Sequence, residues 1–365
     1  MKNEWLKEHI LPLGILAAAL CVFAVLALTG MPAANAALIA LAVWICAEVL
    51  CLILEKKLGG YVLKRFFAGA LTIIVLITVS FFLMHAMPGS PFSQEEQKKL
   101  TAEGLARLNA KYGLDQPVWK QYLTYWKGLL RFDFGTSFKN NQQPVNDIIF
   151  AHFPTSAKVG GIAVLASLII GIPLGIAAAL KRGKFIDSFC MVFATIGISA
   201  PSFVIAVLFM YLFCNVWPIF SSFGLNSWKD YVLPVSCLAF SPIAYIARQI
   251  RSSMLEHMEQ DYIRTARAKG VSEFKVVVKH ALKNAIMPII TYLGPLVAGL
   301  LTGSFVVERM YSISGIGRYF VQSINDMDYT MIMGITIFFG IFVVVCNLVV
   351  DIAAAMIDPR IKLDA

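Results

Sequence analysis

Charged side chains are scarce in this sequence. Lys, Arg, Asp and Glu together make up 15% of its 365 residues, whereas 58% of the residues are hydrophobic. A soluble domain normally contains about 25% charged residues. Several apolar stretches reach the roughly 20 residues that a helix needs to cross the hydrocarbon core of a bilayer. These proportions exclude a water-soluble globular protein and predict an integral membrane protein.

Sequence motifs of enzymes are missing as well. There is no Gly-x-x-x-x-Gly-Lys-Ser/Thr loop to hold nucleotide phosphates, and the five histidines form no His-x-x-x-His pair for a catalytic metal. The seven cysteines lie in or beside apolar stretches without a Cys-x-x-Cys pair, which is typical of small apolar helix residues. We therefore expect no ATPase site, no metal site and no other catalytic site in this chain.

The net charge of +9 is the feature that would fit a nucleic-acid partner. The basic residues, however, stand in short blocks between apolar stretches rather than along one soluble face, as a nucleic-acid-binding domain would require. Basic blocks of this kind are typical of loops at the cytoplasmic face of a membrane. We therefore predict no nucleic-acid partner.

Eight apolar segments are predicted to cross the membrane. Backbone groups in hydrocarbon must be hydrogen-bonded internally, and the alternation typical of barrel strands is absent, so these segments are expected to be helices. They are 11–29, 35–54, 65–87, 157–180, 188–213, 231–250, 285–307 and 331–356. The first segment is long for a signal peptide and the second follows directly, so the two predict an uncleaved hairpin. The predicted fold class is an all-α membrane protein.

The loops between these segments differ in their basic residues. Four regions, at 56–65, 181–184, 248–284 and 360–362, are rich in Lys or Arg, and with eight spans all four fall on one side. Cytoplasmic loops carry the excess of Lys and Arg, so both termini are predicted to be cytoplasmic. The longest external segment is then 88–155. Its aromatic stretch at 119–130 predicts an amphipathic helix on the membrane or against the bundle, or a small folded cap.

The most informative cytoplasmic loop lies at 259–284. Good helix formers at 265–269 are followed by Gly270, which suits the left-handed position that ends a helix. Ser272 then suits the N-cap of a second helix. Two short helices joined by a bend would form a basic, partly apolar knob that fits a groove on another protein. The residues alone leave a solvated basic loop as the alternative.

This loop resembles that of a known family. It follows the pattern Tyr-x-Arg-Thr-Ala-Arg-Ala-Lys-Gly…His-Ala-Leu-x-Asn-Ala…Pro, which is the peptide-permease form of the EAA loop in binding-protein-dependent ABC importer permeases. Where the general family has Glu-Ala-Ala this chain has Arg264-Thr265-Ala266, a departure shared by the peptide and nickel branch. In that family the loop inserts into a groove of the ATPase subunit. The resemblance therefore implies an ATPase-coupling role for Tyr262, Arg264, Thr265, Ala266, Arg267, Ala268, Lys269, Gly270, Glu273, His280 and Asn284.

Shorter matches to the same branch occur in order along residues 61–362. They include Met87-Pro88-Gly89-Ser90-Pro91, Ser314-Gly315-Ile316-Gly317 and the closing Asp358-Pro359-Arg360. The resemblance implies a type I ABC importer transmembrane fold, with a six-helix core and an additional N-terminal two-helix hairpin to which no role is assigned. It divides the chain into the hairpin at 1–60, the first core helix with the external segment at 61–155, and the permease core at 156–357.

The same resemblance implies a B-type permease subunit in the cell (inner) membrane. Such a subunit forms half of the path for oligopeptides or dipeptides that an extracytoplasmic binding protein hands over. The implied partners are a homologous second permease, two ATPase subunits that carry ATP and Mg, and the binding (lipo)protein. No cofactor is expected on this chain itself.

Three alternatives remain open from the sequence. A permease for nickel or another small solute shares most of these motifs, although the sequence has no cluster of His or Cys near the expected path. An ion-coupled secondary transporter would need ionisable residues at mid-membrane, for which Glu48 alone is thin support, since it lies two turns from the cytoplasmic end and can equally extend toward that surface. An assembly or receptor protein without transport would leave the 259–284 loop unexplained.

A few residues are candidates for the transport path or for contact with the binding protein. Pro201 and Pro242 are predicted to break their spans, and a broken backbone is tolerated where it faces a cavity or other protein. Glu308 lies either at the mouth of the path or in an exposed loop. The glycine pairs at 171/175 and 299/303 permit close approach of helices, and we expect them to pack inside the bundle rather than against a second permease.

Overall fold

The computed structural model describes residues 59–86, 113–139, 143–221 and 223–357, with a few positions between 103 and 110. These residues belong to two compact units: residues 69–354 form the larger unit, and the smaller includes residues 59–68 and 355–357. The predicted hairpin at 11–29 and 35–54 lies outside the described residues. The predicted division at residues 60 and 155 stays a prediction.

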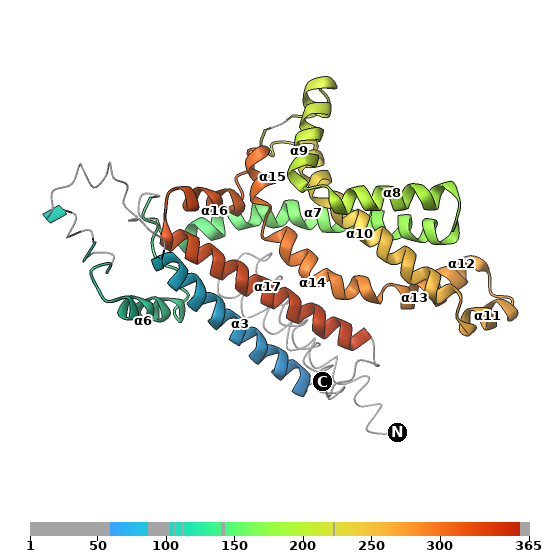
Figure 1. Ribbon diagram of the computed structural model, residues 1–365, viewed down its shortest axis with the longest axis horizontal. Coiled ribbons are helices and arrows are strands. Elements are labelled where there is room, and N and C mark those ends of the chain that lie inside the picture. Colours follow the sequence, from blue (N-terminus) through green and yellow to red (C-terminus); the bar gives the residue numbers. More distant parts are fainter. Residues whose placement is uncertain are drawn as a thin grey trace, which may run out of the picture. The chain divides into compact units, whose positions relative to one another are not determined.

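Every regular element in the described part of the chain is helical. In chain order the elements are α3 (Gly59–Ala86), α6 (Val118–Leu129), α7 (Val145–Leu180), α8 (Phe185–Ser199), α9 (Ser202–Met210), the π-helical η1 (Tyr211–Val216), the short 3-10 helix η2 (Trp228–Tyr231), α10 (Val232–Met258), α11 (Asp261–Ala268), α12 (Glu273–Lys275), the π-helical η3 (Val276–Ala281), α13 (Leu282–Ala285), α14 (Met287–Leu301), α15 (Phe305–Met310), α16 (Ile316–Asn325) and α17 (Tyr329–Ile357) (Figure 1).

The six predicted core spans are confirmed as helices. Within the described residues, five helices are long and apolar enough to cross a membrane, and α8 with α9–η1 gives a sixth if this pair is one broken span. The predicted end of one span is too early. The segment expected at 231–250 continues as α10 to Met258, because Ile250 and Met254 are fully buried and keep the helix packed beyond its basic residues.

The centre of the larger unit is the contact between α7 and α10. A Cβ atom at Gly171 would lie 2.9 Å from the Ile246 side chain, and one at Gly175 would lie 2.6 Å from the Ala247 carbonyl oxygen. Such close approach of two backbones needs residues without side chains. The pair at 171/175 therefore packs inside the chain, as predicted.

Gly160 brings α7 even closer to α14. A Cβ atom there would lie 2.1 Å from the Leu300 carbonyl oxygen, whereas one at the neighbouring Gly161 would meet nothing within 4 Å. We expect Gly160→Ala to lower the free energy of unfolding by about 1–3 kcal/mol, because the helices must move apart. Gly161→Ala is the matched control and should keep or slightly raise stability, because alanine is the better helix former and its Cβ atom has room there. Thermal unfolding of the purified variants in detergent checks this, and equal unfolding midpoints for both would contradict it.

The helix predicted near residues 119–130 is present as α6 and packs on the bundle. Tyr122 lies edge-on to Phe81 of α3 with ring centroids 5.2 Å apart, and its hydroxyl lies 2.8 Å from the Thr78 hydroxyl. On the other face, Thr124 and Lys127 are exposed. One face of α6 therefore belongs to the core that α3 shares with α7 and α17, and the other stays free.

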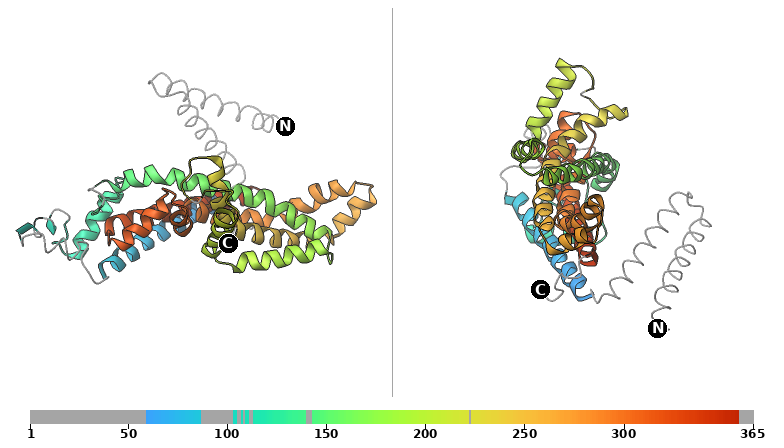
Figure 2. Two further views of the ribbon diagram at one scale, coloured as in Figure 1. Left: turned by 90° about the horizontal axis from the view of Figure 1, so that it is seen from above. Right: turned by 90° about the vertical axis from the view of Figure 1, so that its right-hand side faces the viewer.

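α11 and α12 protrude at the end of α10. They extend beyond the loop between α7 and α8, both in Figure 1 and in the left view of Figure 2. The chain then returns through η3 and α13 to α14. The 259–284 segment is thus a helical projection rather than a loop.

Candidate functional site

α11 is anchored to α10 by its apolar face. Ile263 and Ala266, three residues apart on the helix, are 0% and 7% exposed and belong to one cluster with Ile250 and Met254 of α10. Val276 of η3 is fully buried in the same cluster. Residues three or four apart face the same side of a helix, so a single stripe fixes α11 against its neighbours. The alternative of a solvated basic loop is therefore wrong, because this face is part of the core.

Gly270 ends α11 in the predicted left-handed conformation. Its φ is +73°, its N–H donates to the Arg267 carbonyl at 2.9 Å, and the Val271 N–H donates to the Ala266 carbonyl at 3.2 Å. These two bonds form a Schellman motif, which satisfies carbonyls left free at the end of a helix. A Cβ atom at Gly270 would meet nothing within 4 Å, so the backbone conformation alone demands glycine.

Ser272 occupies the predicted N-cap position of the second helix. Its backbone is extended, with ψ of 143°, and its carbonyl accepts the Val276 N–H at 3.0 Å. Within the described residues its side chain makes no capping hydrogen bond. The helix that follows is irregular, because α12 passes into the wide turn η3 after three residues. The position is confirmed, and the side-chain cap is absent.

An ion pair closes the bend at Gly270. The Arg267 guanidinium donates to both carboxylate oxygens of Glu273, from Nε at 3.1 Å and from Nη2 at 2.6 Å. These hydrogen bonds hold the pKa of Glu273 below its ordinary value, so its carboxyl is ionised at neutral pH. Both side chains are largely exposed, and such pairs contribute only about 0–1 kcal/mol. The pair favours one angle between α11 and α12 rather than supplying stability.

Tyr262 and Asn284 connect the two ends of the segment. The Asn284 amide donates to the Tyr262 hydroxyl at 3.2 Å, and that hydroxyl lies 3.2 Å from Nδ1 of His257 at the end of α10. The structure thus brings Tyr262, Arg267, Glu273 and Asn284 into contacts that hold the projection together. His280 lies half-buried on η3.

The outer surface of the segment is basic with one large aromatic side chain. Residues 259–284 contain six Lys or Arg and three Asp or Glu. Phe274 of α12, four residues after Gly270, is 76% exposed. Of the predicted coupling residues, Arg264, Thr265, Ala268 and Lys269 lie on this exposed surface. A packed helical projection with an exposed aromatic side chain among basic residues is suited to docking in a groove of a partner protein.

The two predicted span-breaking prolines behave differently. Pro201 stands between α8 and α9, where the two helices are bent by 105°, so its predicted break is confirmed. The break predicted at Pro242 is wrong, because α10 is continuous from Val232 to Met258 and Pro242 is buried inside it. Proline inside a membrane helix is tolerated where neighbouring groups compensate for the missing hydrogen bond. Whether either proline lines the path stays a prediction.

Glu308 is not in an exposed loop. It is 2% exposed, and its carboxylate accepts the Ser156 hydroxyl at 2.6 Å and the Arg318 N–H at 3.2 Å. Cβ atoms at Gly303 and Gly315 would lie 2.3 and 2.4 Å from its oxygens. The second Gly of the predicted 299/303 pair therefore makes room for an acid rather than for a helix. The carboxylate lies beside the first turn of α16, where the positive end of the helix dipole favours an anion.

A second buried acid, Asp187, was not predicted from the sequence. Asp187 in the first turn of α8 is buried and accepts two guanidinium N–H groups of Arg251 of α10, from Nη2 at 2.9 Å and from Nε. The Gly183 N–H also donates to Asp187, at 2.9 Å. Asp187 stands directly before the predicted span 188–213 and Arg251 directly after the predicted span 231–250, so the sequence places both at one membrane face but does not pair them. The pair joins the α7–α8 turn to the half of α10 that carries the projection.

Comparison with known proteins gives a consistent result. Residues 171–363 match the family described as binding-protein-dependent transport system inner membrane component, and residues 59–160 match the family of N-terminal segments of such components.

Curated relatives align over most of the chain. It is 47% identical over 307 residues to the dipeptide transport system permease protein DppB of Bacillus subtilis (strain 168), covering 84% of this chain and 99% of the relative. It is 41% identical over 304 residues to DppB of Lactococcus lactis and to the oligopeptide transport system permease protein OppB of Salmonella typhimurium, each covering 83% of this chain and 99% of the relative.

Proposed function

This chain belongs to the family of binding-protein-dependent transport system inner membrane components, and from this premise we propose that it imports short peptides. It is the multi-pass permease subunit of an ATP-binding-cassette importer in the inner membrane, and its substrates are dipeptides or oligopeptides. The observation that carries the proposal is 41–47% identity, over nearly the whole length of the relatives, to permeases named for these peptides. Nickel transport and ion-coupled secondary transport have no comparable support.

The peptide path is formed by two permeases. This chain supplies one half and a homologous second permease the other, and an extracytoplasmic binding protein delivers the peptide. Both termini of this chain are cytoplasmic, which places residues 113–139 outside; the four basic regions on one predicted side support this orientation. The bend at Pro201 faces the path, since irregular backbone inside a membrane needs a cavity or protein beside it.

The 259–284 segment docks into an ATPase subunit. Its exposed basic surface and Phe274 supply the contact, while Ile263 and Val276 fix the segment to α10. A force on the projection therefore reaches a membrane-crossing helix without passing through a flexible linker. ATP and Mg bind in two ATPase subunits, and this chain contributes no catalytic group.

Transport follows alternating access. ATP binding closes the ATPase dimer, moves the projection and reorients the membrane helices. The ATPase dimer must bind the two orientations of the permease with different affinity, because a partner with equal affinity for both shifts nothing.

Uptake by the reconstituted complex tests this function. Proteoliposomes that contain this chain, the second permease and the ATPases are supplied with binding protein and a radiolabelled dipeptide. ATP is omitted, enclosed in the vesicles or added outside them. Uptake that requires both ATP on the projection side and the binding protein is the expected result. Peptide uptake driven by an ion gradient without ATP would contradict it, as would import of nickel but not of peptides.

A further inference from the structure

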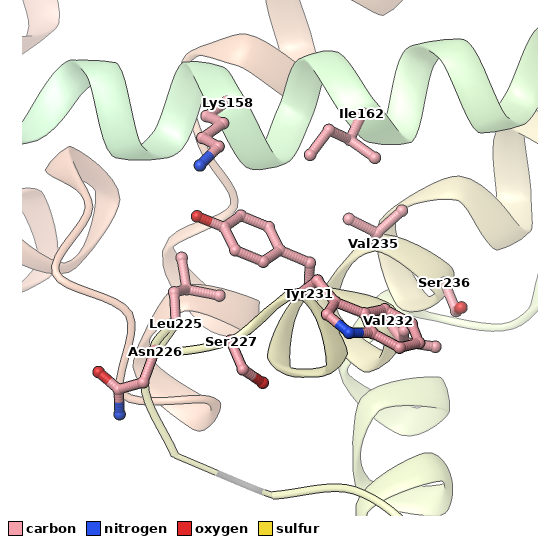
Figure 3. Close-up of a pocket in the computed structure, with 10 residues that line it drawn as sticks. Lys158, Ile162, Leu225, Asn226, Ser227, Tyr231, Val232, Val235 and Ser236 are labelled. Atoms are coloured by element: carbon pink, nitrogen blue, oxygen red, sulfur yellow. The ribbon is translucent and has the colours of Figure 1, made fainter.

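A cavity with one cationic side chain lies between α7 and the start of α10. Its volume is about 640 Å³, within the range of roughly 300–1,000 Å³ typical of small-ligand sites. Figure 3 shows Lys158 projecting from α7 toward the ring of Tyr231, with Leu225, Asn226 and Ser227 on the strand of chain below. The cavity is open enough for a ligand to reach, because both Lys158 and Trp228 are exposed.

The charge of Lys158 has no carboxylate opposite it. None of the ten residues that line the cavity is acidic, and no ion pair joins Lys158 to a carboxylate in the described ranges. The acid nearest in sequence to the lining, Asp230, accepts the backbone N–H groups of Asn226 and Ser227 at 2.9 and 2.7 Å. Asp230 is therefore engaged in holding its own turn. The cavity is electrostatically suited to an anion.

The remaining lining is suited to a ligand that is partly apolar. Nζ of Lys158 lies 4.8 Å from the centroid of the Tyr231 ring, and Trp228 is 74% exposed beside it. The aromatic ring orients the ammonium group by a cation–π contact, without neutralising its charge. Asn226 and Ser227 add neutral hydrogen-bonding groups.

We propose that this cavity is a subsite for the free α-carboxylate of the transported peptide, with Lys158 as its cationic partner. This inference rests on the proposed function. Every unmodified peptide ends in a carboxylate whatever its sequence, so one lysine can contact all of them, while Trp228 and Tyr231 receive a variable apolar side chain. In the proposed orientation Lys158 lies at the external end of the apolar part of α7, where an entering peptide arrives.

The experiment compares two substrates on two permeases. Uptake of a dipeptide and of the same dipeptide with a C-terminal amide is measured in proteoliposomes holding the whole complex, with wild-type chain or Lys158→Met. The binding protein also discriminates between the two substrates, but the same binding protein serves both permeases. Dividing the acid-to-amide uptake ratio of the wild type by that of Lys158→Met therefore isolates the effect of Lys158. We expect Lys158→Met to slow uptake of the free acid about tenfold, as for loss of a charge-assisted hydrogen bond, and to leave amide uptake unchanged.

Two controls complete the design. Lys158→Arg should keep the preference for the free acid, and Lys229→Met should too, because Lys229 is a neighbouring lysine beside Trp228 that does not line the cavity. Equal losses for both substrates in Lys158→Met would overturn the proposal in favour of a structural or permease–permease contact. A loss that appears only in vesicles containing anionic phosphatidylglycerol, and not in phosphatidylcholine vesicles, would overturn it in favour of a lipid phosphate. Absence of ATP-dependent uptake by the wild-type complex would instead reject the proposed function, and this inference with it.

Discussion

Replacing Gly270 by proline is expected to lower peptide uptake by roughly a hundredfold while leaving the chain in the membrane. Gly270 has a φ of +73°, and its N–H donates to the Arg267 carbonyl. Proline fixes φ near −65° and has no N–H, so it can neither adopt this conformation nor make this hydrogen bond; inside a helix a comparable misfit costs about 3 kcal/mol or more. A cost of this size reduces the population of the native bend about a hundredfold. Uptake should fall much more than ATP hydrolysis, because the altered bend loosens the connection between the ATPase and α10.

Two milder substitutions test whether position 270 needs the left-handed backbone conformation or glycine itself. Asparagine tolerates the left-handed region and its Cβ atom would meet nothing within 4 Å, so Gly270→Asn should transport nearly normally. Gly270→Ala should fall between the two, since an ordinary residue loses about 1–2 kcal/mol in this conformation. Uptake and ATPase rates of the three variants are compared at equal amounts of assembled complex. Normal uptake by Gly270→Pro would contradict a coupling role for the projection.

The sequence predicted Gly270 because its requirement is local. A helix end with a left-handed residue can be recognised from the local amino-acid pattern. The six core spans can be recognised in the same way, from the length of their apolar stretches. Pro242 shows the limit of such local rules, because packing around α10 keeps that helix continuous where the sequence predicts a break. The end of α10 was also misplaced, since basic residues near a membrane face can continue a helix that is packed on its other side.

The charged contacts could not be predicted, because they join residues distant in sequence. Ser156 and Glu308 lie 152 positions apart, and Asp187 and Arg251 lie 64 positions apart. Nothing in the local pattern indicates that Gly303 and Gly315 leave room for a carboxylate rather than for another helix. Only the folded chain shows that these acids are partnered.

The Asp187–Arg251 pair carries the second large expected effect. Arg251→Met should lower the free energy of unfolding by about 3 kcal/mol, because it leaves a buried carboxylate with the Gly183 N–H as its one remaining described hydrogen-bond donor. This is the lower end of the range for broken buried pairs. Asp187 stands beside the exposed turn between α7 and α8, so water can reach the orphaned charge after a small movement.

The double variant Asp187→Leu/Arg251→Met tests whether the unpaired charge is the cause. Replacing both partners of a buried pair by apolar side chains is often neutral, so most of the lost stability should return. Arg182→Met is the control for losing a cation near the same membrane face. Nη1 of Arg182 lies 3.1 Å from Oε1 of Glu259, and both side chains are exposed. This pair should therefore contribute at most about 1 kcal/mol to the free energy of unfolding. Thermal unfolding in detergent ranks the variants. If Arg251→Met is no less stable than Arg182→Met, or if the double variant is less stable than Arg251→Met, the buried charge does not control the stability of this contact between α8 and α10.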